Sequence, residues 1–232
     1  MDTSTITPDH LVWWQWGMIK LNATIVFTWL IMGLLTLGAW LATRRFSSGP
    51  AIPRWQNFLE IIVLNIREQI TEISRRDPNP FIPFIGTLFL FIALSNILSI
   101  LPGYHAPTGS LSTTTALSLC VFIAVPYFGI RHQGVYGYFK HYFQPTVFMF
   151  PFHVIGEISR TVALAIRLFG NIMSGAKIVV ILLAIAPLFF PILMHALELL
   201  IGLIQAYIFA ILAMVYIASA MHLHDRQQEP GD

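Results

Sequence analysis

The sequence predicts an all-α polytopic membrane protein with about five transmembrane spans and one amphipathic helix at the membrane surface. The first observation is composition: 56% of the 232 residues are hydrophobic and 10% are charged, which is too apolar for a single soluble core. The second is the stretch between Asp77 and Arg131, which contains no charged residue and is long enough for two spans of about 20 residues each. The third is the clustering of arginines after the first apolar segment.

The first expected span covers residues 21–45 and follows an N-terminal segment of residues 1–20. Because positive residues accumulate on the cytoplasmic side, the arginine-rich connection after this span is expected in the cytoplasm. The N-terminal segment is then outside, and the tail of residues 224–232 is cytoplasmic. The chain begins without the basic region of a signal peptide, so the first span is expected to be retained. The arginines are Arg44, Arg45, Arg54, Arg67, Arg75 and Arg76.

Residues 53–76 are predicted to form the amphipathic helix on the cytoplasmic surface. Apolar residues recur there at helical spacing, with charged residues between them. The segment Asp77-Pro78-Asn79-Pro80 ends the helix, because a proline biases the preceding residue away from helical geometry. The apolar residues are Phe58, Ile61, Ile62, Ile66, Ile70 and Ile73.

Residues 81–130 are predicted to form a transmembrane hairpin, interrupted at Pro102-Gly103. Asn96 and Ser99 lie inside its first span, where a polar side chain generally needs a hydrogen-bond partner on a neighbouring helix. We therefore interpret both as helix-packing residues.

Residues 148–223 are predicted to form a second helical hairpin, longer than the first. Its first half, Phe148 to Ala186, has about 39 residues and would exceed a hydrocarbon core of about 30 Å almost twofold. Its second half has the same excess, so two strongly tilted helices are expected. The sequence has no internal repeat, and the inverted-repeat plan of many secondary transporters has no support.

Arg167 lies within an apolar stretch of this hairpin, Val162 to Ile185, in the setting Ile166-Arg167-Leu168-Phe169-Gly170-Asn171. An arginine near mid-bilayer costs about 2.5–3.5 kcal/mol on insertion scales, and its guanidinium cannot escape that cost by losing a proton. No acidic residue lies three or four positions away. The sequence therefore predicts a functional site in which a negative group meets a fixed positive charge.

Polar residues form one stripe on each helix of this hairpin, each within a sector of about 80° at 100° per residue. The two stripes either line a wet path or satisfy each other, and Glu157 with Arg160 can form a local ion pair. Arg167 and Gln205, the deep member of each stripe, are expected to face one groove. The first stripe is His153, Glu157, Arg160, Arg167 and Asn171; the second is His195, Glu198, Gly202, Gln205 and Tyr216.

The chain resembles subunit a of the F-type rotary ATP synthases over nearly all residues after about residue 50. The motifs that carry the resemblance are Gln56-Asn57-Phe58-Leu59-Glu60, Leu88-Phe89-Leu90-Phe91 with Asn96, Leu101-Pro102-Gly103, Arg167-Leu168-Phe169-Gly170-Asn171 and Gln205-Ala206-Tyr207-Ile208-Phe209. Two residues depart from the family pattern: Ala176 stands where many members carry an acid or a histidine, and Thr161 where proline is common.

The resemblance implies roles for individual residues. Arg167 resembles the essential stator arginine, Gln205 its partner on the last helix, and Asn171 the neighbouring polar residue. Glu198 resembles the ionisable position of the outer access channel. His153 and Glu157 occupy the region of the access paths, and His195, beside Glu198, is expected to assist ion access from outside.

The resemblance also implies a function: an ion-translocating, non-catalytic stator subunit in a bacterial plasma (inner) membrane. Its expected partners are the c-ring, the peripheral-stalk b subunits and membrane lipid, with no nucleic acid, cofactor or metal. Two alternatives stay open, a self-contained secondary ion transporter or channel and a purely structural subunit. The choice of proton or sodium ion, the ring size and the direction of turnover depend on other chains.

Overall fold

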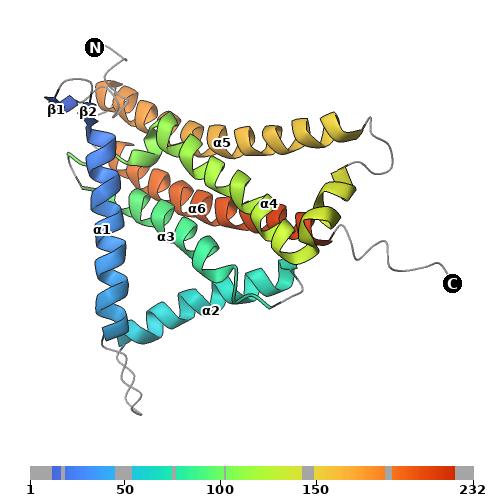
Figure 1. Cartoon of the computed structure of the whole chain (residues 1–232). Helices are drawn as coiled ribbons and strands as arrows, with labels where there is room; N and C mark the ends of the chain where they lie inside the picture. The colour runs from blue at the N-terminus through green and yellow to red at the C-terminus, as the bar shows by residue number, and fades with distance from the viewer. Residues whose placement is uncertain are drawn as a thin grey trace.

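The computed structural model describes residues 12–16, 19–44, 54–74, 77–101, 103–142, 149–185 and 190–222. Six α-helices, one 3-10 turn and a two-stranded hairpin occur in this part of the chain (Figure 1). Their bounds are β1 Val12–Trp16, β2 Ile19–Asn22, α1 Ala23–Arg44, α2 Arg54–Ser74, α3 Ile82–Leu98, η3 Pro107–Gly109, α4 Leu111–Tyr142, α5 Met149–Ile185 and α6 Phe190–His222.

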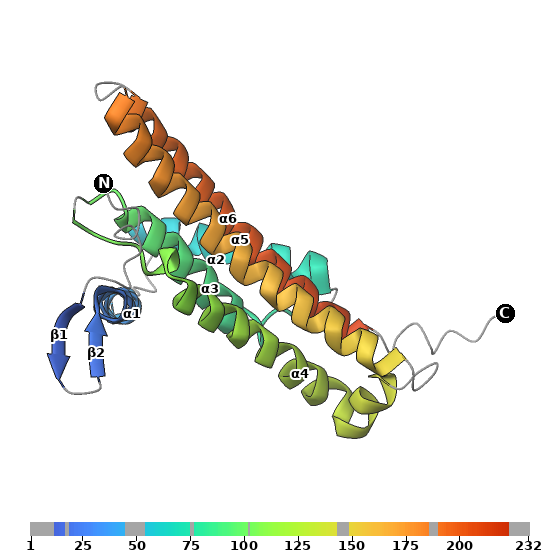
Figure 2. The same ribbon diagram turned by 90° about the horizontal axis from the view of Figure 1, so that it is seen from above.

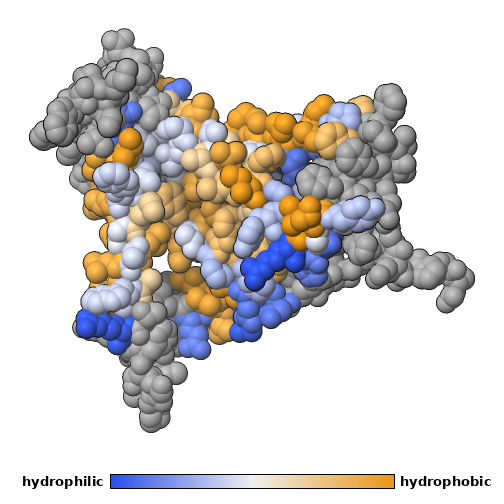
Figure 3. Space-filling view, viewed as in Figure 1, coloured by the Kyte–Doolittle hydropathy of each residue, from blue (hydrophilic) through white to orange (hydrophobic). Residues whose placement is uncertain are grey.

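The predicted all-α polytopic fold is confirmed. Helices α1, α4, α5 and α6 are each long and apolar enough to cross a membrane. Helix α3 is also apolar but has 17 residues, at the lower limit of about 17 for a spanning helix. Hydrophobic residues cover much of the molecular face in Figure 3, and hydrophilic residues gather at its lower edge, where α2 and the end of α4 lie.

Helix α6 is the centre of the fold. It runs antiparallel to α5 along almost its whole length (Figure 2), and it also contacts α2, α3 and α4. Apolar side chains of α6 are fully buried against side chains of these neighbours, so α6 is fixed from several sides. Large buried core residues include Phe209, Met214, Ile217 and Met221 of α6, with Ile92 of α3, Val121 of α4 and Leu168 of α5.

Helix α1 stands at one edge of the molecule, next to the β1–β2 hairpin (Figure 2). The antiparallel pairing runs from Val12 opposite Asn22 to Trp16 opposite Ile19, with an irregularity after Val12. The sequence analysis assigned residues 1–20 only as an outer segment and did not anticipate the strands. Their aromatic and β-branched residues favour extended structure, but two strands of 4 or 5 residues are too short for a clear alternating pattern.

Helix α4 continues well beyond the expected end of the hairpin at residue 130, and it bends sharply at Gly134. The backbone of Gly134 has φ 76° and ψ 162°, a conformation that only glycine adopts readily. The bend returns Tyr138 onto α4, where a side chain at Gly129 would approach the Tyr138 ring to 2.7 Å. Gln133, just before the bend, donates hydrogen bonds to the carbonyl oxygens of Ala220 (2.9 Å) and Met221 (3.0 Å) near the end of α6.

We predict that Gly134→Ala destabilises the protein by about 1–3 kcal/mol, because a Cβ forces an unfavourable backbone conformation even where space is open. No neighbouring atom lies within 4 Å of the added Cβ, so the effect reports backbone strain alone. Gly137→Ala is the matched control, since its Cβ meets only Gln133 at 3.5 Å, an ordinary contact. Thermal unfolding followed by circular dichroism measures both; equal midpoints for the two variants would contradict the prediction.

Candidate functional site

Two cavities lie at different heights along the α5–α6 pair. The loop-side cavity, of about 380 Å³, is lined by α3, α5, α6 and the segment Tyr104–Gly109. The kink-side cavity, of about 250 Å³, is lined by α4, α5 and α6 near the bend of α4. Polar residues of the loop-side cavity include Asn96, Ser99, Asn171, Ser174, His195 and Glu198. Those of the kink-side cavity are Gln133, Tyr138, His153, Glu157, Arg160, Tyr216 and Ser219.

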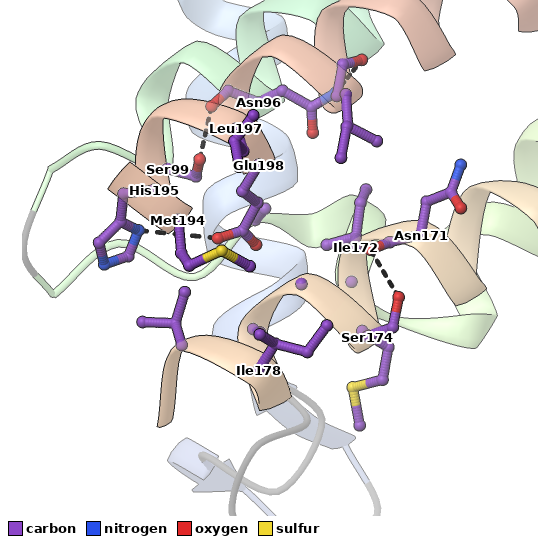
Figure 4. Close-up of a pocket in the computed structure, with 18 of the residues that line it drawn as sticks. Asn96, Ser99, Asn171, Ile172, Ser174, Ile178, Met194, His195, Leu197 and Glu198 are labelled. Atoms are coloured by element: carbon purple, nitrogen blue, oxygen red, sulfur yellow. Dashed lines mark hydrogen bonds and ion pairs between the residues drawn. The ribbon is translucent and has the colours of Figure 1, made fainter. Parts of the chain in front are cut away.

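Glu198 is the acidic residue of the loop-side cavity. Its side chain reaches from α6 toward α5 (Figure 4), where the absence of a side chain at Gly175 leaves room for it. One carboxylate oxygen, Oε2, lies 3.6 Å from Nδ1 of His195, and the Glu198 side chain is 21% exposed. A carboxylate that remains accessible from a polar cavity is suited to exchange ions with water in that cavity.

The loop that closes this cavity has a buried, neutral hydroxyl. The Tyr104 oxygen is buried, and burial raises the pKa of Tyr104 to about 12. The phenol therefore stays protonated at physiological pH. Nearby, the hydroxyls of Ser95 and Thr108 lie 3.1 Å apart and join α3 to η3.

Arg160 forms one wall of the kink-side cavity together with α6. Its guanidinium carbon lies 5.5 Å from the ring centroid of Tyr216, within the range of a cation–π interaction. Glu157 and His153 line the same cavity and each makes further interactions. The cavity therefore combines positive, acidic and imidazole groups within two turns of α5.

Gln205 lies between the two cavities, on α6, and is only 2% exposed. Asn171 of α5 donates a hydrogen bond from Nδ2 to its Oε1 at 2.8 Å. The other end of the amide, Nε2, is buried with no hydrogen-bond partner among the described residues. Gln205 thus holds α5 and α6 together and keeps one donor unused.

Arg167 lies on the outer face of α5, one helical turn from Asn171. It is exposed and makes no hydrogen bond or ion pair with any residue that the structure describes. Its side chain lines an open hollow of about 510 Å³ along α5 itself. The other residues of the hollow are Ile158, Ser159, Val162, Ala163 and Ile166.

The structure brings the predicted residues together in groups rather than as two continuous stripes. His153, Glu157, Arg160 and Tyr216 share the kink-side cavity; Asn171, His195, Glu198 and Gly202 share the loop-side cavity. Arg167 and Gln205 do not line one groove as expected, because Arg167 faces outward and Gln205 inward. Asn171 links the two positions, since it is four residues after Arg167 and bonds Gln205.

Sequence reasoning missed the part that Gly175 has in placing Glu198. Lys177 is exposed and does not line the cavity, whereas Ala176 does. The ionic neighbour of Glu198 is His195 on its own helix. Among the described residues, no cluster of three or more His, Cys, Asp or Glu side chains is placed to hold a metal ion.

Comparison with known proteins gives one consistent family. The family model described as ATP synthase A chain matches residues 25–218. ATP synthase subunit a 2 of Acaryochloris marina is 62% identical over 215 residues, covering 93% of this chain and 92% of that protein. ATP synthase subunit a 1 of Crocosphaera subtropica is 60% identical, covering 96% of both chains. ATP synthase subunit a of Albidiferax ferrireducens is 57% identical, covering 98% of both.

We predict that Asn171→Leu destabilises the protein by about 1–3 kcal/mol, because it leaves the buried Gln205 amide without any partner. The double variant Asn171→Leu/Gln205→Leu is expected to recover most of this loss, since both polar groups are then replaced by apolar ones. Ser174→Ala is the control, because its exposed hydroxyl bonds only the Asn171 carbonyl of its own helix. The midpoint of thermal unfolding measures all three; additive losses in the double variant would contradict the prediction.

Proposed function

Because this chain belongs to the ATP synthase A chain family, we propose that it is the stator past which a ring of carboxylate-bearing helices turns as ions cross the membrane. The chain is a non-catalytic membrane subunit of an ATP synthase. Its contribution to ATP synthesis or hydrolysis is the ion path. The observation that carries the proposal is Arg167, an exposed cation on an apolar helix face without a partner in the described part of the chain.

The chemistry of this cation defines the partner. A carboxylate crosses hydrocarbon cheaply only when it is neutral, because burial of an unpaired ion costs far more than burial of its protonated form. At a separation of 4 Å and an effective dielectric constant of about 20, the attraction to a guanidinium is about 4 kcal/mol. Arg167 therefore stabilises an ionised rotor carboxylate at one position in the rotation of the ring and favours release of its ion there.

The two cavities supply the ends of the path. The loop-side cavity, with Glu198 and His195, is the access path from the outside, and the kink-side cavity, with His153 and Glu157, leads to the cytoplasm. Arg160 and Asn171 border different cavities and are 11 residues apart on α5, or about 16 Å at 1.5 Å per residue. Arg167 lies between them, so an ion moves from one cavity to the other on the rotor.

The membrane potential drives the exchange between these two paths. Each unit charge that crosses 100 mV releases about 2.3 kcal/mol. Because Arg167 separates the loading and unloading positions, a rotor carboxylate that loads on one side of it completes nearly a full turn before it unloads on the other. Proton and sodium ion are both compatible with this scheme, since the ion is bound by the ring.

The proposed orientation puts the N-terminus outside and the C-terminus in the cytoplasm, as the arginine-rich connection between α1 and α3 favours. The exposed apolar face of α5 then meets the c-ring. The exposed apolar residues of α1 meet lipid and the peripheral-stalk b subunits, and include Trp29, Leu30, Leu34, Leu37 and Leu41.

A self-contained transporter is less well supported. Such a protein needs its own ion site in the middle of the membrane, and the membrane-embedded acids Glu157 and Glu198 instead line separate cavities. Neither of them pairs with Arg167. A purely structural subunit leaves the exposed arginine in an apolar surface unexplained.

We predict that Arg167→Ala abolishes ion-coupled ATP synthesis and leaves assembly intact, because the arginine has no partner in the described part of the chain whose loss would destabilise the fold. Arg167→Lys is expected to fail or to be severely impaired, since lysine is a point charge that deprotonates when buried. Lys177→Gln is the control, because Lys177 is an exposed cation on the same helix that lines no described cavity. Synthesis by assembled complexes in inverted membrane vesicles is the measurement, and substantial synthesis by Arg167→Ala would sink the proposal.

We predict that Glu198→Gln slows passive ion flux through membranes stripped of the soluble motor. In intact complexes, the slower translocation is expected to stay coupled to ATP synthesis. The neutral amide keeps the shape of the side chain and loses its ability to bind and release an ion. Flux is compared with that of Lys177→Gln in the same vesicles. An unchanged flux would contradict a role of Glu198 in ion access and leave it only a structural role.

A further inference from the structure

Two glycines on the facing helices create notches into which polar side chains fit. At Gly202 of α6, an added Cβ would lie 2.8 Å from Cγ and 2.9 Å from Nδ2 of Asn96, closer than non-bonded atoms approach. Asn96 comes from α3, is 5% exposed, and donates a 2.7 Å hydrogen bond from Nδ2 to the Gly202 carbonyl oxygen. A larger residue at position 202 therefore excludes Asn96 from its present position.

The second notch is at Gly175 of α5. An added Cβ there would lie 3.0 Å from Oε1 and 3.1 Å from Cδ of Glu198. The carboxylate of Glu198 thus rests directly against the backbone of α5. Glu198 and Gly202 are four residues apart, one turn of α6, so both notches act on the same stretch of that helix.

We propose that Asn96 is a positioning residue for Glu198: it holds α6 against α3 at Gly202 and thereby sets the depth at which the Glu198 carboxylate enters the notch at Gly175. Asn96 does not itself exchange the ion. This inference rests on the proposed function of Glu198 in the outer access path. It goes beyond that function, because it assigns the placement of the carboxylate to a side chain on a third helix.

The arrangement differs from ordinary helix packing in two ways. The amide of Asn96 bonds the Gly202 carbonyl oxygen, which lies inside α6 and is not an unpaired group at a helix end. The bond therefore fixes the position of α6 along its axis and its rotation about that axis. Asn96 and Glu198 also line the same cavity, as Figure 4 shows. A shift of α6 at Gly202 is therefore transmitted over one turn to the group that meets the ion.

The test is a rescue experiment on assembled ATP synthase in vesicles stripped of the soluble motor. Passive flux is followed with a pH-sensitive dye and with radioactive sodium, and is normalised to the amount of assembled complex. Gly202→Ala is expected to reduce the flux at least about tenfold, because a displacement of about 1 Å at a reacting group can cost up to about a hundredfold in rate. Asn96→Ala is expected to have a smaller effect, since it removes the bond without creating a clash.

The double variant Asn96→Ala/Gly202→Ala decides the proposal. Its flux is expected to return to the level of Asn96→Ala alone, because the space vacated at position 96 accepts the new methyl group. Gly86→Ala on α3 is the control, since no atom lies within 4 Å of its added Cβ. A flux in Gly202→Ala equal to that of Gly86→Ala, or a double variant as slow as Gly202→Ala, would overturn the inference.

Glu198→Gln is measured in parallel to separate the two proposals. If Glu198→Gln leaves the flux unchanged, the proposed function of Glu198 fails, whatever the glycine variants do. If Glu198→Gln reduces the flux but Gly202→Ala does not, the access role stands and the positioning role of Asn96 fails. A purely structural role for Asn96 would lower the amount of assembled complex without changing the flux per complex.

Discussion

One constraint governs this molecule: a guanidinium that cannot lose its proton lies on the apolar surface of a membrane helix. Within the described structure, Arg167 makes no ion pair and lines a hollow formed by α5 alone. Since a charge at membrane depth is costly, the chain is a stable unit only when another molecule, or water, meets this surface. The outer face of α5 is correspondingly bare, with Ile158, Val162 and Ile166 exposed around the arginine.

Helices α5 and α6 differ in how much of their surface is packed against the rest of the chain. Helix α6 is packed by four other helices and contributes Phe209, Met214, Ile217 and Met221 to the buried core, so its polar residues Glu198 and Gln205 are held in position. Helix α5 has one face on α6 and one face open. Its exposed residue Asn171 still reaches Gln205 with a hydrogen bond, while Arg167, one turn away, is exposed and bonds no described residue. The well-packed helix α6 thus orients α5, which presents the charge of Arg167.

The sequence was sufficient for the features that depend on local composition. Hydropathy and length predicted the apolar helices, and the arginine in an apolar run identified Arg167. It was not sufficient for features that depend on tertiary contacts: the bend at Gly134, the return of Tyr138 onto Gly129, and the notch at Gly175 for Glu198. Helical periodicity put Arg167 and Gln205 on polar stripes, but it could not show that one faces outward and the other inward, because that depends on how α5 is rotated against α6.

The packing between the two cavities explains why the proposed path needs a moving partner. Leu164, Leu168 and Phe209, which are almost completely buried, fill the interior of the hairpin near the level of Arg167. Transfer of a bare ion through such an apolar region costs on the order of tens of kcal/mol, far more than the roughly 2.3 kcal/mol per 100 mV that the membrane potential supplies. Ions that enter beside Glu198 therefore do not reach Glu157 through this chain. In the proposed function, the ion instead passes over the exposed face of α5 on a rotor carboxylate that is neutral everywhere except beside Arg167, so each ion that crosses moves the rotor.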